Sequence, residues 1–340
     1  MIKESIRKLS SKQDLTQAEA YEAMSEIMSG NAAESQIAAF LMGLRLKGES
    51  VDEIAGCARS MREKAVRINS KKGPVIDTCG TGGDATGTFN ISTTAAIIAS
   101  AGGAVVAKHG NRAVSSKCGS ADVLKGLGVN IEIPPGRVEE VLDEVGITFL
   151  FAPLMHGAMK FAAPVRRDLG IRTIFNILGP LTNPAAAKRQ LLGVFDESLT
   201  EPMAGVLREL GSEHAIVVHG EGGFDELSTL GRSKVTELRN GTLKTYQIDA
   251  QELGVKRAAI DAIRGGDVET NVRLTRSILD GADGAPTDIA LLNAGAALMV
   301  AGRAATLMEG VRIAREVVKS GAALQKLMHW VEATNKQSNS

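Results

Sequence analysis

The first 70 residues of the chain carry apolar side chains at helical spacing. One such face has apolar residues three or four positions apart, at Ile37, Phe40, Leu41 and Leu44. Two capping boxes mark helix starts, Thr16 with Glu19 and Ser50 with Glu53. The pattern predicts three helices, each with a face to bury against the others or against a partner subunit.

From position 75 the pattern changes to short β-branched runs that alternate with helical stretches. These runs are Val75-Ile76, Ala104–Ala107, Ile147–Phe151, Leu191–Val194 and Ala215–Val218. Asn240-Gly241 between two further runs predicts a tight hairpin, and positions 267–330 return to helix. The expected fold class is α/β: a small all-helical N-terminal domain plus a larger domain with a mostly parallel central sheet flanked by helices.

Charge and cysteine content narrow the classes of function. Lysine plus arginine equals aspartate plus glutamate at 39 each, so no overall basic field exists to hold nucleic acid or a membrane surface. The longest weakly polar run, Thr93–Ala107, is too short to span a membrane. Cys57, Cys79 and Cys118 are too widely spaced for a disulfide framework or a zinc site. With no signal-peptide pattern at the start, we expect a cytoplasmic protein.

A glycine-rich segment at 77–88 follows a predicted strand and precedes a helix that opens at 90–94. Its four glycines allow close backbone approach, and its hydroxyls and helix amides can donate to phosphate oxygens. Gly80–Ala85 matches the dinucleotide pattern, but Lys108 and His109 stand where a ribose-binding carboxylate should follow. No Walker lysine follows the glycines either. A loop for another polyanion is favoured over a turn without a ligand.

A second polar segment, 108–122, follows the next predicted strand. It holds three cations, three serines, two glycines and an asparagine, at the end of a strand where α/β folds bind ligands. Lys117 alone is as well explained as a surface lysine. The cluster as a whole predicts a site that complements the first loop.

Asp225 and Glu226 form an acidic pair after a third predicted strand. Adjacent carboxylates in a glycine-rich loop suit Mg²⁺, which is often bound by one or two carboxylates plus substrate phosphate. From the residues alone, a solvated surface pair is the more common explanation. The five histidines lack HExxH spacing, so a zinc hydrolase is not expected, and His109 is the one of interest.

The combined motifs resemble the anthranilate phosphoribosyltransferase family, whose fold is nucleoside-phosphorylase-like. The resemblance rests on Gly80-Thr81-Gly82-Gly83-Asp84, Asn90-Ile91-Ser92-Thr93 and Lys108-His109-Gly110-Asn111-Arg112, and it extends through 165–173, 176–184 and 225–228. It implies a helical domain at 1–72 with a contribution from about 164–186, and a phosphoribosyl-pyrophosphate-binding α/β domain at 73–340. It also implies a homodimer that uses Mg²⁺ in a step of tryptophan biosynthesis.

The resemblance also assigns residues to each ligand. For phosphoribosyl pyrophosphate it assigns Gly80, Gly83, Asp84, Thr88, Asn90, Ile91, Ser92, Thr93, Lys108, His109, Gly110, Asn111, Arg112, Ala113, Val114, Ser115, Ser116 and Ser120. For anthranilate it assigns Gly80, Asn111 and Arg166. For magnesium it assigns Ser92, Asp225 and Glu226.

The implied reaction displaces pyrophosphate from the ribose anomeric carbon by the amino group of anthranilate. Lys108 and magnesium would stabilise the leaving pyrophosphate. The guanidinium of Arg166 is suited to bind the anthranilate carboxylate through two parallel hydrogen bonds. His109 either accepts the proton of the amine after attack or lines the pocket, and the sequence does not decide between these roles.

Two other functions fit parts of the pattern. A pyrimidine-type nucleoside phosphorylase shares the architecture, but its Lys-His-Ser pattern is replaced here by Lys108-His109-Gly110-Asn111. A non-catalytic nucleic-acid-binding relative should be basic and could lose the acidic pair. This chain is neutral and keeps Asp225 and Glu226.

Overall fold

The computed structural model of the chain describes residues 1–83, 86–113 and 118–336. Its N-terminal part contains four helices: α1 (Ile2–Ser10), α2 (Gln17–Met28), α3 (Glu34–Lys47) and α4 (Val51–Lys64). Both predicted capping boxes are present, at the starts of α2 and α4. The expected number of three helices was wrong because α1 is short and begins without a side-chain cap, so it lacks a start signal.

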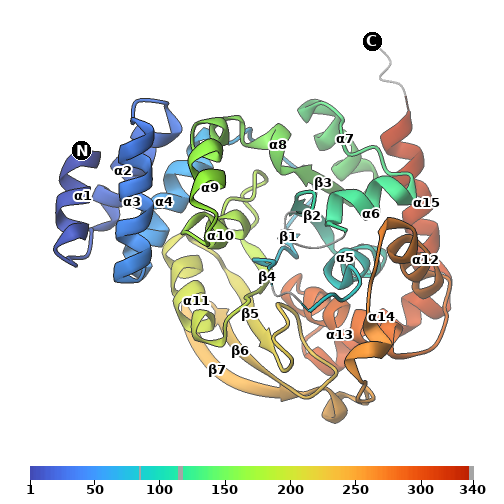
Figure 1. Cartoon of the computed structure of the whole chain (residues 1–340). Coiled ribbons are helices and arrows are strands. Elements are labelled where there is room, and N and C mark those ends of the chain that lie inside the picture. Colours follow the sequence, from blue (N-terminus) through green and yellow to red (C-terminus); the bar gives the residue numbers. More distant parts are fainter. Residues whose placement is uncertain (84–85, 114–117, 337–340) are drawn as a thin grey trace.

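A seven-stranded sheet lies at the centre of the remaining chain, in the order β3-β2-β1-β4-β5-β6-β7 (Figure 1). The strands are β1 (Val75–Asp77), β2 (Val105–Gly110), β3 (Ile147–Phe151), β4 (Arg189–Gly193), β5 (His214–Gly220), β6 (Arg232–Arg239) and β7 (Thr242–Asp249). The first five pair in parallel, and β6 and β7 join antiparallel through the predicted Asn240-Gly241 turn. The predicted fold class is confirmed.

Helices flank the sheet along the rest of the chain. Their bounds are α5 (Ile91–Ala101), α6 (Ser120–Leu127), α7 (Pro135–Val145), α8 (Ala152–Met155), α9 (Ala163–Leu169), α10 (Phe175–Leu178), α11 (Thr200–Glu209), α12 (Val268–Leu279), α13 (Ala285–Val300), α14 (Leu307–Lys319) and α15 (Ala322–Asn335). Short 3-10 turns connect some of them: η1 (Gly157–Phe161), η2 (Gly179–Leu181), η3 (Glu197–Leu199), η4 (Ala250–Leu253) and η5 (Ile260–Ile263). Within the described ranges, no helix combines the length and the apolar character that a membrane crossing requires.

Alternate residues of β5 enter two separate hydrophobic cores. Ile216 and Val218 belong to the core that contains α5 and α13, whereas Ala215 and Val217 belong to the core that contains α2, α4 and α11. Because successive side chains of a strand point to opposite faces, the sheet separates the two cores.

The second core also joins distant parts of the sequence. Ala162, Val165 and Phe175, from the segment around α9 and α10, are buried in it with the N-terminal helices. Figure 1 shows this segment between α1–α4 and the sheet. The division of the chain at residues 72 and 73, with a helical contribution from about 164–186, stays a prediction.

Strand β2 extends further than the sequence pattern indicated. It pairs with β3 at three positions beyond Ala107, so that Lys108 lies opposite Phe149 and His109 opposite Leu150. These two residues were expected in a loop because their side chains are polar. Their backbones are instead paired in the sheet, and because both side chains are buried, each requires a hydrogen-bond partner inside the protein.

The carboxylate of Glu53 organises the junction between α3 and α4. It is fully buried and accepts hydrogen bonds from the backbone nitrogens of Leu15 (2.9 Å) and Ser50 (2.8 Å), and from Lys47 Nζ (2.8 Å). Its removal would leave a largely buried ammonium and a buried N–H group without this acceptor.

We therefore expect Glu53→Ala to lower the free energy of unfolding by about 3 kcal/mol. Asp52→Ala, which removes a neighbouring exposed carboxylate, should cost less than about 1 kcal/mol. Chemical denaturation followed by circular dichroism measures both. Equal losses for the two variants would contradict the role given to Glu53.

Candidate active site

Asp77, at the end of β1, lies at the centre of the candidate site. Its carboxylate is 0% exposed and accepts hydrogen bonds from the backbone nitrogen of His109 (3.2 Å) and from Asn183 Nδ2 (2.7 Å). Asn183 Nδ2 also donates to the carbonyl of Ala107 at 2.8 Å. Burial raises the pKa of Asp77 to about 6, against the lowering effects of Asn183 and Lys108, so the group is mainly ionised at neutral pH.

Sequence reasoning missed both Asp77 and Asn183. The available signals were weak: an acid at the end of an apolar strand, and an asparagine before a proline. Their pairing across more than 100 positions is visible only in the fold. Together they tie the ends of β1 and β2 to the segment that follows η2.

Lys108 connects the glycine-rich loop to the first turn of α5. Its side chain is only 2% exposed, and its Nζ donates to the carbonyl of Thr78 (3.0 Å) and to Ser92 Oγ (3.2 Å). Two residues predicted for ligands, Lys108 and Ser92, are therefore in direct contact. Among the described residues, the hydrogen-bond partners of this buried ammonium are neutral oxygens, so it is well suited to meet an incoming anion.

The acidic pair reaches the glycine-rich loop although it lies far away in sequence. Asp225 Oδ2 accepts a hydrogen bond from the backbone nitrogen of Gly82 at 2.7 Å. A Cβ atom on Gly80 would lie 2.5 Å from the same oxygen, and one on Gly193 would lie 1.4 Å from the carbonyl oxygen of Asp225. The two glycines thus allow the close contact between the loop and Asp225. Glu226 follows directly and is partly buried.

The remaining predicted residues of the first loop lie at the start of α5. Asn90 precedes the helix, its backbone nitrogen donates to Asn271 Oδ1 (3.0 Å), and its Nδ2 donates to the carbonyl of Cys118 (3.1 Å). Thr88 is partly exposed, whereas Ile91 and Thr93 are buried. Asn90 therefore links the two polar segments. This contact agrees with the prediction that the second segment complements the first loop.

Arg172 is a further cation at this loop that sequence reasoning did not single out. Its guanidinium donates to the carbonyl of Gly83 and lies 4.2 Å from the centre of the Phe195 ring. Stacking on an aromatic face holds the planar group in place while it keeps other donors available. The predicted residue Asp84, next to Gly83, lies outside the described residues.

The second polar segment folds back on the start of α6. Ser120 Oγ donates to the carbonyl of Asn111 at 3.2 Å, and the backbone nitrogen of Ala113 donates to Asp122 Oδ2 at 3.1 Å. A Cβ atom on Gly110 would lie 2.4 Å from Ser120 Oγ, so this glycine permits the close return of the chain. The predicted residues Val114, Ser115 and Ser116 lie outside the described part of the chain.

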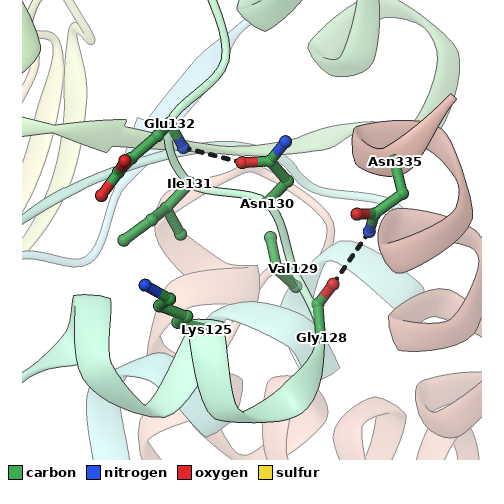
Figure 2. Close-up of a pocket in the computed structure, with 7 residues that line it drawn as sticks. All are labelled: Lys125, Gly128, Val129, Asn130, Ile131, Glu132 and Asn335. Atoms are coloured by element: carbon green, nitrogen blue, oxygen red, sulfur yellow. Dashed lines mark hydrogen bonds between the residues drawn. The ribbon is translucent and has the colours of Figure 1, made fainter. Parts of the chain in front are cut away.

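Arg112 makes its contacts away from the glycine-rich loop. Its Nη2 lies 3.0 Å from Glu132 Oε1 in an exposed ion pair, and its guanidinium lies 5.6 Å from the centre of the Phe151 ring. Glu132 also borders a cavity of about 260 Å³ between the end of α6 and Asn335 (Figure 2). Of the predicted ligand residues that the structure describes, none lines that cavity.

His109 forms a buried pair with His156, a residue that sequence reasoning had left as structural. His109 Nδ1 lies 3.1 Å from the carbonyl oxygen of Gly179, and its Nε2 lies 3.1 Å from His156 Nε2. Burial lowers the pKa of His109 to about 3 and that of His156 to about 4. Both rings are therefore uncharged at neutral pH.

Arg166 lies on α9, in the segment next to the N-terminal helices. Its guanidinium lies 5.0 Å from the centre of the Phe175 ring, and burial lowers its pKa. Within the described residues, no hydrogen bond, ion pair or ring contact joins it to Gly80 or Asn111. The structure thus does not bring together the three residues predicted for anthranilate by direct contact.

Two family models match the chain and together span most of it. Residues 3–65 match the helical bundle domain of a glycosyl transferase family, and residues 72–324 match the a/b domain of that family. The fold and the loop site therefore define a glycosyl transferase built from a helical bundle and an α/β domain.

Relatives with known names narrow this class. The anthranilate phosphoribosyltransferase of Symbiobacterium thermophilum is 51% identical over 331 residues, which cover 97% of either chain. The crystal structure of the enzyme of that name from Thermus thermophilus is 46% identical, with a TM-score of 0.93 over 98% of this chain and 99% of that chain. The enzyme from Saccharomyces cerevisiae in complex with PRPP and Mg is 26% identical, with a TM-score of 0.89 over 98% and 97% of the two chains. A further structure of the yeast enzyme is a complex with 4-fluoroanthranilate. The chain belongs to the anthranilate phosphoribosyltransferase family.

The close contact at Gly193 leads to a prediction about stability. In Gly193→Ala the new methyl group would overlap the backbone of Asp225, which cannot rotate away, so we expect a loss of about 3 kcal/mol in the free energy of unfolding. In Gly80→Ala the methyl group comes closest to the carboxylate of Asp225, and the Asp225 backbone oxygen lies at an ordinary 3.4 Å, so the loss should be smaller. Gly136→Ala is the control, because nothing lies within 4 Å of its added Cβ. If Gly193→Ala melts at the temperature of the parent, the contact with Asp225 is wrong.

Proposed function

We propose that the protein transfers the phosphoribosyl group of phosphoribosyl pyrophosphate to the amino group of anthranilate, giving N-(5-phosphoribosyl)anthranilate and pyrophosphate in tryptophan biosynthesis. The observation that carries this proposal is the meeting of the glycine-rich loop, buried Lys108 and Asp225 at one edge of the sheet. The names of relatives about 50% identical over nearly the whole chain support the same activity.

The backbone and hydroxyl groups of the loop are suited to hold the phosphates. The glycines expose N–H groups, and Ser92 and Thr93 stand in the first turn of α5, where helix amides and the helix dipole favour an anion. Lys108 is held between the loop and that turn. Positive charge at this point stabilises pyrophosphate as it leaves, because the charge is already in place and shielded from water.

The donor set near the loop fits magnesium. Asp225 and Glu226 supply hard anionic oxygens, Ser92 supplies a hydroxyl, and a site of this kind is completed by substrate phosphate. The contact between Asp225 and Gly82 holds one carboxylate at the loop where pyrophosphate would lie. When bound, the metal would neutralise charge on the diphosphate. The yeast relative in complex with PRPP and Mg supports this assignment.

The aromatic substrate requires placement more than activation. An aromatic amine is uncharged at neutral pH, so orientation against the ribose carbon can supply much of the rate gain, with effective molarities of roughly 10⁵ M or more in good geometries. Arg166, stacked on Phe175, offers a rigid bidentate partner for the carboxylate. The yeast relative in complex with 4-fluoroanthranilate supports a site for such a ring.

We also propose that the protein acts as a homodimer in the cytoplasm, with no nucleic-acid or membrane partner. The balanced charge of the chain, with 39 basic and 39 acidic residues, supports the absence of a nucleic-acid partner. The family resemblance supports the dimer.

The test of this function follows the fluorescence of anthranilate after mixing with phosphoribosyl pyrophosphate and Mg²⁺. We expect the signal to fall only when all three are present, and to stop when the metal is chelated. The variant Asp225→Asn with Glu226→Gln should need more Mg²⁺ for the same rate, because two anionic ligands are removed while the side-chain shape is kept.

Two outcomes would change the assignment. Phosphate-dependent breakdown of a pyrimidine nucleoside without loss of anthranilate would favour a nucleoside phosphorylase. An unchanged Mg²⁺ requirement in the double variant would place the metal elsewhere while leaving the reaction intact.

A further inference from the structure

The contacts of the His109 ring determine where its proton lies. A backbone carbonyl can only accept a hydrogen bond, so the atom that faces the Gly179 oxygen at 3.1 Å, His109 Nδ1, must carry the hydrogen. A neutral imidazole has one N–H group and one lone pair. The lone pair of His109 therefore lies on Nε2.

The second ring must then supply the hydrogen between the two histidines. His156 Nε2 lies 3.1 Å from His109 Nε2, and two lone pairs at this distance would repel each other. His156 therefore carries its hydrogen on Nε2 and donates it to His109. The rings meet edge to face, with centres 4.9 Å apart and planes inclined by 63°.

Three elements hold this arrangement in place. His109 lies on β2, where its backbone nitrogen donates to Asp77; Gly179 begins η2; and His156 follows α8. Burial, then His156 and Lys108, lower the pKa of His109, and burial alone lowers that of His156, so neither ring gains a proton near neutral pH. The remaining nitrogen, His156 Nδ1, makes no hydrogen bond with the described residues and is not among the atoms sealed from solvent.

We propose that His156 is a positioning residue that keeps His109 in its Nδ1–H form and occupies the lone pair on His109 Nε2. His109 then acts as an uncharged wall of the site and does not accept the proton of the anthranilate amine. Of the two histidines, His156 has the lone pair that this arrangement leaves unused, on Nδ1. The part that concerns anthranilate rests on the proposed function, whereas the order of protons is a property of the free protein.

The physical consequence is that the two histidine rings stay uncharged on the side of the site proposed for the aromatic amine. Positive charge develops on the ribose as pyrophosphate leaves, and an imidazolium beside it would oppose that charge. A histidine already hydrogen-bonded at both nitrogens is a poor base, since protonation would require the His156 contact to break. This decides between the two roles that the sequence left open for His109.

The direct test is ¹⁵N NMR of the ligand-free protein labelled in its histidines, with His156→Gln used to assign the pair. We expect His109 Nδ1 and His156 Nε2 to be protonated, the other two nitrogens to be bare, and a scalar coupling across the hydrogen bond to join the two Nε2 atoms. A proton on His109 Nε2, or a bare His156 Nε2, would overturn the proposal.

Kinetics test the same contact in the working enzyme. His156→Leu removes the donor and should raise the KM for anthranilate about tenfold, the scale of one lost hydrogen bond, while the KM for phosphoribosyl pyrophosphate stays within about twofold. His156→Gln keeps an N–H donor and should recover most of the effect. His329→Gln, a change at an exposed histidine, is the matched control.

The two levels of failure can be told apart. If Leu and Gln at position 156 are equally impaired, or both match the parent, donation to His109 is not what position 156 contributes. If the NMR pattern is found but anthranilate is not consumed, the proton order stands and the proposed function fails.

Discussion

The buried carboxylate of Asp77 is the constraint on which the candidate site depends. A charge at the end of a central parallel strand is costly unless its oxygens are fully bonded, and here the partners come from β2 and from Asn183. Satisfying that carboxylate fixes the backbone at His109 and brings the segment after η2 against the sheet. Lys108 on one side and the histidine pair on the other are then set at fixed positions relative to the same strand end.

The site separates charge into two zones around this anchor. On the side of the glycine-rich loop, Lys108 contacts the first turn of α5, Arg172 donates to the carbonyl of Gly83, and Asp225 accepts from Gly82. This combination of cations and a carboxylate at one loop suits a metal–diphosphate group. On the other side the histidines are neutral, an environment that suits an uncharged aromatic amine. The chain is neutral as a whole, so recognition of the anionic substrate depends on this local arrangement and not on long-range attraction.

The features that short stretches of sequence encode were predicted, whereas those that depend on contacts between distant segments were missed. Capping boxes, the Asn240-Gly241 hairpin and the alternation of strands and helices are short-range signals, and all are present in the structure. The end of β2 was misjudged because Lys108 and His109 have polar side chains, although their backbones pair with β3 in the sheet. His156 carried no local signal and Asp77 only a weak one, since each acquires its role from a residue at least 30 positions away. The roles of single residues toward the two substrates stay predictions.

The most direct test of this account is the kinetic effect of Asp77→Asn. An amide can replace only one of the two accepting oxygens, so an N–H group would face either the His109 backbone nitrogen or Asn183. Because both halves of the site depend on this strand end, we expect kcat/KM to fall about 100-fold for anthranilate and for phosphoribosyl pyrophosphate alike, in protein that remains folded. If kcat/KM falls for one substrate only, or remains at the parent value for both, Asp77 is not the anchor of the site.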